Sequence, residues 1–198
     1  MAQYEHLMVE ITGGPQGRAS LAERLGAWSG ADRPLGLFVS QLGWSASEVA
    51  ILIEDREAAT RDAAETLAGD HGLSLIQRRL LRQTLRPSAG ARLTRGGVWV
   101  HRTFEVRTEN LQTFIELSGE GWQDFERRFD VRVFGLFEVI EPRPDPTVTE
   151  LLLLTRYGSH GIWEESRDPS TEAMQTFGRR AALTLRTRAA SSLLAWSA

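Results

Sequence analysis

Apolar and polar residues alternate most clearly in the stretch Val98–Arg107, VWVHRTFEVR. Alternation in an extended strand places every second side chain on the same face. One face then carries a histidine and a glutamate, and its members are Trp99, His101, Thr103 and Glu105. The other face is apolar apart from Arg102, and its remaining members are Val98, Val100, Phe104 and Val106. The pattern predicts a strand with one apolar face and one face that bears a His and a Glu.

A weaker copy of this stretch, YEHLMVEIT, opens the chain at Tyr4. Subtracting 95 from each residue number aligns His101 with His6 and Glu105 with Glu10. Similarity at one fixed displacement indicates a repeated structural unit. We therefore expect two related halves, each opening with a strand that carries a His-x-x-x-Glu pattern.

The first half predicts the element order β-α-β-β-α-β. After the opening strand we expect a helix over 18–28, strands over 35–42 and 49–54, a helix over 56–68 and an extended segment over 73–85. In the last segment Leu73, Leu75 and Leu81 are expected to point inward. This order is the split βαβ arrangement of a ferredoxin-like domain, whose two helices cover one face of a four-stranded antiparallel sheet.

The second half repeats the order after a connector rich in Pro, Gly and Ser. Helical segments are expected over 109–129 and over 164–180, around Asp168-Pro169, with strands over 131–140 and 150–156. Residues 183–196 favour a last strand, although their pattern also suits a continuing helix. The predicted division is 1–87, an N-terminal repeat, 88–97, a linker, and 98–198, a C-terminal repeat.

Each predicted sheet has an uncovered, partly apolar face that must be buried. The nearest cover is the bare face of the other half. The fold class predicted is therefore α+β, with tandem ferredoxin-like repeats that form a dimeric-type α+β barrel within one chain. Enclosed spaces of this kind are common ligand sites.

Composition narrows the range of partners. A formal net charge of −3 and a pI near 5.9 leave no excess positive field for nucleic acid. The absence of cysteine excludes thiolate chemistry and sulfur-ligated metals. The longest apolar run, Leu151–Leu154, is too short to span a bilayer. We expect a cytoplasmic protein, and the basic residues, all arginine, suggest a GC-rich bacterial source.

Four stretches of the second half resemble the NIPSNAP branch of the dimeric α+β barrel superfamily: WVHRTFEVR, FGLFEV, LLLLTRY and GSHGIWEESRDPS. The resemblance covers about 98–196, and the matching positions are Arg102, Thr103, Phe104, Arg156 and Tyr157. The chain departs from the family at His101, where an aliphatic residue is usual, and at Thr155, where Trp is usual.

The resemblance implies a fold and an internal pocket. Relatives across the superfamily include cofactor-free monooxygenases and cyclases of aromatic polyketides, haem-binding chlorite dismutase-like proteins and haem-degrading enzymes. Association into a homodimer is expected only by analogy with these relatives.

The candidate catalytic residues are His101, Glu105 and Arg156. A histidine titrates near neutral pH and is a natural general acid or base. Glu105 lies two inward positions from His101, so it could orient the imidazole. Arg156, or alternatively Arg102, could hold a substrate anion. The non-catalytic alternative is that His101 and Glu105 are ordinary polar residues at the barrel mouth.

The residues expected to bind a ligand are His6, Glu10, Trp99, Arg102, Thr103, Tyr157 and His160. A metal held by the two His-x-x-x-Glu pairs is conceivable but not favoured, because ligands on two sheets must converge on one point. For haem, the free candidates are His71 and His160, and the turn sequences around them favour exposed residues.

The sequence therefore predicts a NIPSNAP-like barrel protein that binds a small apolar or aromatic metabolite. The favoured function is a cofactor-independent cyclase, isomerase or monooxygenase of specialised metabolism. The alternative is a haem-binding or non-catalytic ligand-binding protein.

Overall fold

The computed structural model describes residues 3–29, 32–55, 72–141 and 144–198. The strands are β1 (Gln3–Ile11), β2 (Arg33–Leu42), β3 (Glu48–Asp55), β4 (Leu73–Gln83), β5 (Val98–Arg107), β6 (Val131–Val139), β7 (Val148–Tyr157) and β8 (Thr184–Ser197). The helices are α1 (Gly14–Gly26), the 3-10 turn η1 (Thr108–Asn110), α3 (Leu111–Arg128), α4 (His160–Glu165) and α5 (Glu172–Ala181).

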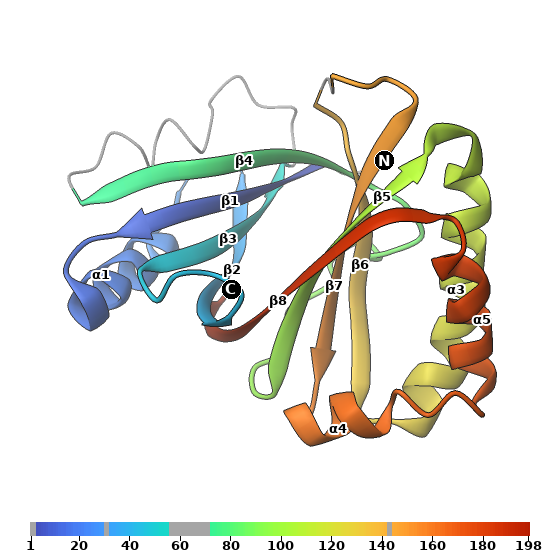
Figure 1. Ribbon diagram of the computed structural model, residues 1–198. Helices are drawn as coiled ribbons and strands as arrows, with labels where there is room; N and C mark the ends of the chain where they lie inside the picture. The colour runs from blue at the N-terminus through green and yellow to red at the C-terminus, as the bar shows by residue number, and fades with distance from the viewer. Residues whose placement is uncertain (1–2, 30–31, 56–71, 142–143) are drawn as a thin grey trace.

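The strands close into a barrel in the order β1-β3-β2-β8-β5-β7-β6-β4. Within it, β4-β1-β3-β2 and β8-β5-β7-β6 follow the same ferredoxin-like order, and all pairings are antiparallel. Two junctions join these sets, β2 with β8 and β4 with β6 (Figure 1). The predicted α+β class is confirmed, and the two sets share a common interior.

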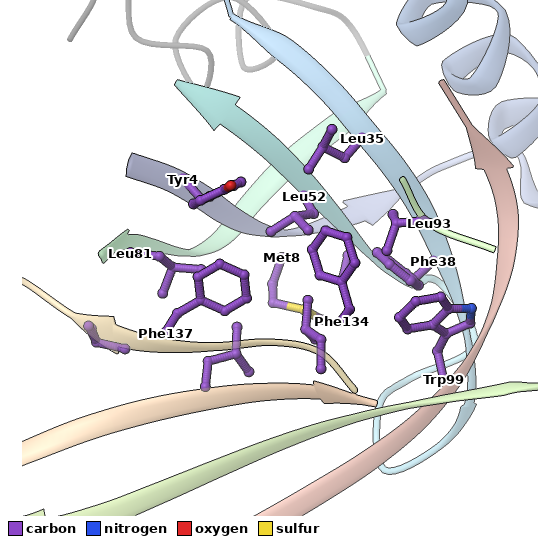
Figure 2. Packing of buried hydrophobic residues seen from close by; sticks show 14 residues of the cluster. Tyr4, Met8, Leu35, Phe38, Leu52, Leu81, Leu93, Trp99, Phe134 and Phe137 are labelled. Carbon is purple, nitrogen blue, oxygen red and sulfur yellow. The ribbon is translucent and has the colours of Figure 1, made fainter. Parts of the chain in front are cut away.

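An apolar cluster fills much of the barrel interior (Figure 2). Its buried members come from both strand sets: Tyr4, Met8, Leu35, Phe38, Ala50, Leu52, Leu81, Leu93, Trp99, Phe134, Phe137, Val139, Leu152 and Leu154. Burying a large apolar side chain stabilises the fold by roughly 1.5–3 kcal/mol. This cluster therefore holds the two strand sets together.

Helices cover the outer faces of both sets (Figure 1). On the first set, Leu21 and Leu25 of α1 pack against apolar residues of β1, β2 and β3. On the second, Phe114 and Trp122 of α3 pack against β5, β6 and β7, while α5 lies beside α3. No helix in the described ranges has the length and apolar character needed to cross a membrane.

The structure decides several local expectations. Residues 184–197 form a strand, β8, and not a continued helix. The helical region at 164–180 is split into α4 and α5, because Asp168-Pro169 interrupts it. The helix expected over 56–68 lies outside the described residues.

The expectation of three inward leucines in β4 is right only for Leu81, which is fully buried in the interior cluster. Leu73 packs on the outer face with α1, and Leu75 is 40% exposed. The cause is a bulge between Met8 and Val9 in the pairing of β1 with β4, which shifts the alternation by one residue.

The expected linker, 88–97, contributes to the barrel core. Leu93 is buried and packs among the interior residues. It lies against Gly36 of β2, where a Cβ would come within 2.5 Å of the Leu93 Cδ1 atom. The connector therefore does more than join two halves, because it closes part of the interior.

Candidate functional site

Two histidines meet inside the barrel. His6 lies on β1 and His101 on β5, each at the centre of its own strand set. Strand alternation turns both inward, and barrel closure brings His6 Nε2 to 3.1 Å from His101 Nδ1, across 95 positions of sequence. Only 1% of His6 and 4% of His101 is exposed. The pair therefore forms a buried polar contact within an apolar interior.

Ser192 of β8 continues the contact. Its Oγ lies 3.0 Å from His101 Nε2 and donates to the backbone carbonyl of Trp99 at 3.3 Å. Because the hydroxyl has a single proton, its oxygen accepts from His101 Nε2–H. These partners assign the tautomers: His101 Nδ1 is an acceptor, and His6 Nε2–H donates to it. The result is a directional chain of donors, from His6 through His101 and Ser192 to Trp99.

The chain begins at an atom without a partner. His6 Nδ1 is buried and makes no hydrogen bond with any described residue. In the assigned tautomer this nitrogen carries a free lone pair. An unsatisfied buried acceptor costs about 1–3 kcal/mol, so a ligand donor at this nitrogen would recover the loss.

Burial keeps both imidazoles neutral. Desolvation lowers the pKa of His6 to about 3, and the positive charge of Arg79 acts in the same direction. Desolvation also holds the pKa of His101 well below its usual range, with further lowering by His6 and Arg79. Aromatic rings enclose His101 edge-on, Phe38 and Trp44 each at 4.7 Å between centroids. At neutral pH both imidazoles are therefore unprotonated, and their lowered pKa values make them weak bases unless a negative charge forms beside them.

A cavity of about 260 Å³ opens beside the pair. Polar and apolar residues from six strands and from the loop after β2 line it: His6, Met8, Gly43, Trp44, Glu48, Ile76, Gln77, Arg79, His101, Thr103, Leu152, Arg188, Ala189 and Ala190. Arg79 Nε donates to Glu150 Oε1 at 2.9 Å. The cavity thus combines neutral imidazoles with two guanidinium groups, those of Arg79 and Arg188.

The glutamates of the His-x-x-x-Glu pattern lie elsewhere. Glu10 is exposed and accepts from Ser47 Oγ at 3.2 Å. Glu105 is half-buried, in register with Glu150 on one side and Arg186 on the other. Because both ring nitrogens of His101 are bonded to His6 and Ser192, the group that orients His101 is Ser192 and not Glu105. No group of three or more metal-ligand side chains is assembled within the described ranges.

The remaining predicted residues divide between three places. Thr103 lines the cavity, while Trp99 is 2% exposed and packs between Phe38 and Phe134 in the core. Arg102 and Tyr157 lie on the outer face, under α3 and α5.

Arg156 and His160 do not line the cavity. Arg156 pairs with Trp99 in the sheet, so it shares the inner face but lies beyond the cavity. Arg156 forms an ion pair with Asp130 at 2.6 Å and bonds the Gly96 carbonyl. His160 is exposed at the start of α4. The geometry therefore gives neither residue access to the cavity that His6 and His101 line.

Sequence reasoning missed Ser192, Arg79 and Trp44. Ser192 adjoins the apolar residues of the run SSLLAW, and this polar residue beside an apolar segment was the one sequence feature that could have indicated it. Arg79 lies in a strand whose alternation is shifted by a bulge. Trp44 lies in the turn after β2, where no periodicity indicates direction.

The sequence matches no protein-family model and no curated protein. Its fold matches several solved structures. An anthrone oxidase-like protein aligns with a TM-score of 0.62 at 15% identity, over 99% of this chain and 92% of its own. A ferredoxin fold protein of Listeria monocytogenes, related to antibiotic biosynthesis monooxygenases, gives 0.56 at 13%, over 98% and 95%. A chlorite dismutase from Candidatus Nitrospira defluvii gives 0.64 at 9%, over 96% and 90%.

Identities this low establish the fold and nothing finer. The chain has a ferredoxin-like α+β fold similar to that of these structures. The structures that share this architecture span several activities by their descriptions.

Proposed function

We propose that this protein is a cofactor-independent enzyme that removes a proton from a small, largely apolar or aromatic molecule bound inside the barrel. The observation that carries the proposal is the buried donor chain that starts at the unpartnered His6 Nδ1 atom, next to a cavity of about 260 Å³. A phenol, an enol or an activated C–H group would present its proton to this nitrogen.

Each residue of the donor chain has a role in the proposed proton transfer. His6 Nδ1 takes the proton, and the electron pair stays on the substrate as a delocalised oxyanion. The new charge on His6 is shared with His101 through their 3.1 Å bond. Ser192 fixes the ring of His101 and is a positioning residue. General-base catalysis of this kind contributes typically 10²–10⁴-fold in rate.

The positive electrostatic potential in the cavity would stabilise the negatively charged form of the substrate. Arg79 disfavours a positive imidazolium, and the same positive charge stabilises a negative substrate. Arg188 adds a second guanidinium to the cavity lining. These two residues, and not Arg156 or Arg102, are the proposed anion holders. Arg188 is the main one, because the charge of Arg79 is partly neutralised by its ion pair with Glu150.

Proton removal is the step shared by the cyclase, isomerase and monooxygenase reactions that the fold suggests. The anthrone oxidase-like neighbour favours a fused aromatic ketone as the first substrate class to test. In that reaction the anthrone carbanion reacts with O2, and loss of water leaves the quinone. O2 is the oxidant, so no organic cofactor is required.

The test is O2-dependent conversion of anthrone to anthraquinone, followed by absorbance. His6→Gln and His101→Gln are expected to lower the rate 10²–10⁴-fold. His160→Gln, which changes an exposed histidine outside the cavity, is the matched control and should keep the rate. Wild-type rates in folded His6→Gln and His101→Gln proteins would exclude the assignment. Binding without turnover would instead indicate the non-catalytic alternative.

Haem is the cofactor that the resemblance to the barrel superfamily implies, and the described residues do not fit it. Haem requires an axial ligand that faces an apolar slot. His6 and His101 bond each other in a cavity that also holds Arg79 and Glu48. His160 is exposed on a six-residue helix. The proposed reaction therefore does not involve haem.

The finer relationship is also a proposal. The same strand order in the two sets supports an origin by duplication of one ferredoxin-like unit, with the boundaries 1–87 and 98–198. The motifs over 98–196 support a NIPSNAP-type member that acts in bacterial specialised metabolism.

A further inference from the structure

Three arginines gather on the outer face of the second strand set, away from the barrel interior. Arg102 comes from β5, Arg167 follows α4, and Arg180 lies in the last turn of α5. They line one small chamber, of about 20 Å³, between the sheet and the helices. A chamber of this volume has room for about one water molecule or one atom group of that size. None of the three has a carboxylate partner in the ranges that the structure describes.

Other arginines in the same layer are paired. Arg127 and Arg128 both bind Asp124, and Arg179 binds Glu120. Carboxylates are therefore available around α3 and α5. The three arginines of the chamber differ from these, because their positive charges lie close together and no carboxylate of the described residues pairs with them.

Aromatic faces support the guanidinium groups of Arg167 and Arg180. Arg167 also donates to Ser166 Oγ and to the Tyr157 hydroxyl. The Arg180 guanidinium lies over Phe177 at 4.6 Å and Phe104 at 5.0 Å. Among the described residues, the Arg180 guanidinium donates to Ser118 Oγ, at 3.3 Å. A guanidinium carries five donors in its plane, and contact with a ring face uses none of them. A planar or tetrahedral oxyanion is the group that matches this arrangement.

The electrostatics of the chamber point the same way. The pKa of Arg180 is lowered to about 9, first by burial and then by the charges of Arg102 and Arg167. Burial likewise lowers the pKa of Arg102. Guanidinium groups carry a positive charge at neutral pH, so the three groups repel one another until an anion neutralises them.

A groove of about 400 Å³ adjoins the chamber and shares with it Arg102, Arg167 and Arg180. Its other walls include Met174 and Leu185, and 52% of the Leu185 surface is exposed. The site thus has a charged inner end and a partly apolar outer end. We propose that it binds a small amphipathic anion, with a carboxylate or phosphate head on the three arginines and a short apolar body in the groove.

This site is separate from the proposed catalytic cavity. Neighbouring positions on a strand face opposite sides of the sheet, so His101 points into the barrel and Arg102 out of it. Binding at the arginines therefore needs neither His6 nor His101. The two proposals can fail independently.

The direct test is calorimetric titration of the wild-type protein with octanoate and with octyl phosphate, with octanol as the neutral control. We expect saturable binding of one or both anions and no binding of octanol. Octanoate alone would identify a carboxylate site, and octyl phosphate alone a phosphate site. Acetate and inorganic phosphate should bind more weakly, because they lack the apolar body. Failure of both octyl anions to bind at millimolar concentration would overturn the proposal.

Matched variants locate the site. Arg180→Met should weaken anion binding about 10- to 100-fold, since it removes a charge-assisted contact. Arg179→Met changes the next residue, which is exposed and paired with Glu120, and should bind like wild type. His6→Gln should also bind like wild type. Equal binding by wild type and Arg180→Met, or equal loss in Arg179→Met, would contradict the assignment.

A second measurement separates a ligand site from a structural arginine. Without ligand, Arg180→Met should melt at or above the wild-type temperature, because it replaces an uncompensated buried charge with an apolar chain. A lower melting temperature together with unchanged binding would indicate a purely structural role. If Arg180→Met does not fold, Arg102→Gln replaces it, since Arg102 is less buried.

Discussion

Two adjacent residues of β5, His101 and Arg102, show opposite ways to bury a basic side chain. His101 faces the interior, is neutral, and has both ring nitrogens hydrogen-bonded. Arg102 faces the helices, stays charged, and shares its chamber with Arg167 and Arg180. One face of the strand is thus suited to moving a proton, and the other to holding an anion.

The difference follows from the intrinsic acidity of the two groups. An imidazole can lose its proton near neutral pH, so burial removes its charge at small cost. A guanidinium keeps its proton at neutral pH, so burial leaves a charge that needs an outside partner. The hydrogen-bonding groups of the interior histidine pair are therefore satisfied except at His6 Nδ1. The three outer arginines have no carboxylate counter-ion among the residues that the structure describes.

The largest effect expected from this comparison is a loss of stability in mild acid. The pKa of His6 is lowered to about 3 in the folded state and that of His101 is lowered too, whereas both should lie near 6.5 when unfolded. Below about pH 6.5 the unfolded chain binds more protons, so stability falls as the pH falls towards the folded pKa. Each histidine contributes about 1.4 kcal/mol per pH unit.

Urea unfolding at pH 7, 6 and 5 measures this loss. The His6→Gln/His101→Gln double variant should lose much less stability over the same range, while His160→Gln should follow the wild type. Carboxylates titrate mainly below this window, since their usual pKa values lie near 4. Parallel curves for wild type and double variant would show that the two histidines are not buried neutral.

A smaller effect is expected from the two serines of β8. Ser192→Ala removes the acceptor of His101 Nε2–H and should destabilise the protein by about 1–3 kcal/mol. Ser191→Ala is the matched control, because the Ser191 hydroxyl is buried without a partner in the described structure. It should be neutral or slightly stabilising. Equal costs in thermal unfolding would mean that the donor chain does not hold His101.

The smallest effect concerns Arg156, which is paired with Asp130. Arg156→Gln breaks an ion pair with Asp130, whose side chain is 61% exposed, and should cost less than about 1 kcal/mol. Turnover should stay within about two-fold of wild type, because Arg156 lies outside the barrel cavity. A large fall in turnover would return Arg156 to the anion-holding role that the sequence suggested.

Local pattern was enough for the strands and for the inward direction of His6 and His101. It failed in β4, because one bulge opposite Met8 reverses the alternation and exposes Leu75. The alternation also led to the prediction that Glu105 orients His101, because the two residues occupy successive inward positions on one strand. In the structure the nearest polar groups come from other strands, His6 from β1 and Ser192 from β8.

The amino-acid sequence by itself determined the strand periods, the repeated order of elements and the identity of the buried basic residues. The tertiary structure decided which of them meet. Closure of the barrel sets the register between β1, β5 and β8, and packing of α5 against the sheet brings Arg180 to Arg102. Such contacts join residues far apart in the chain, and their geometry depends on the whole fold and not on any local pattern.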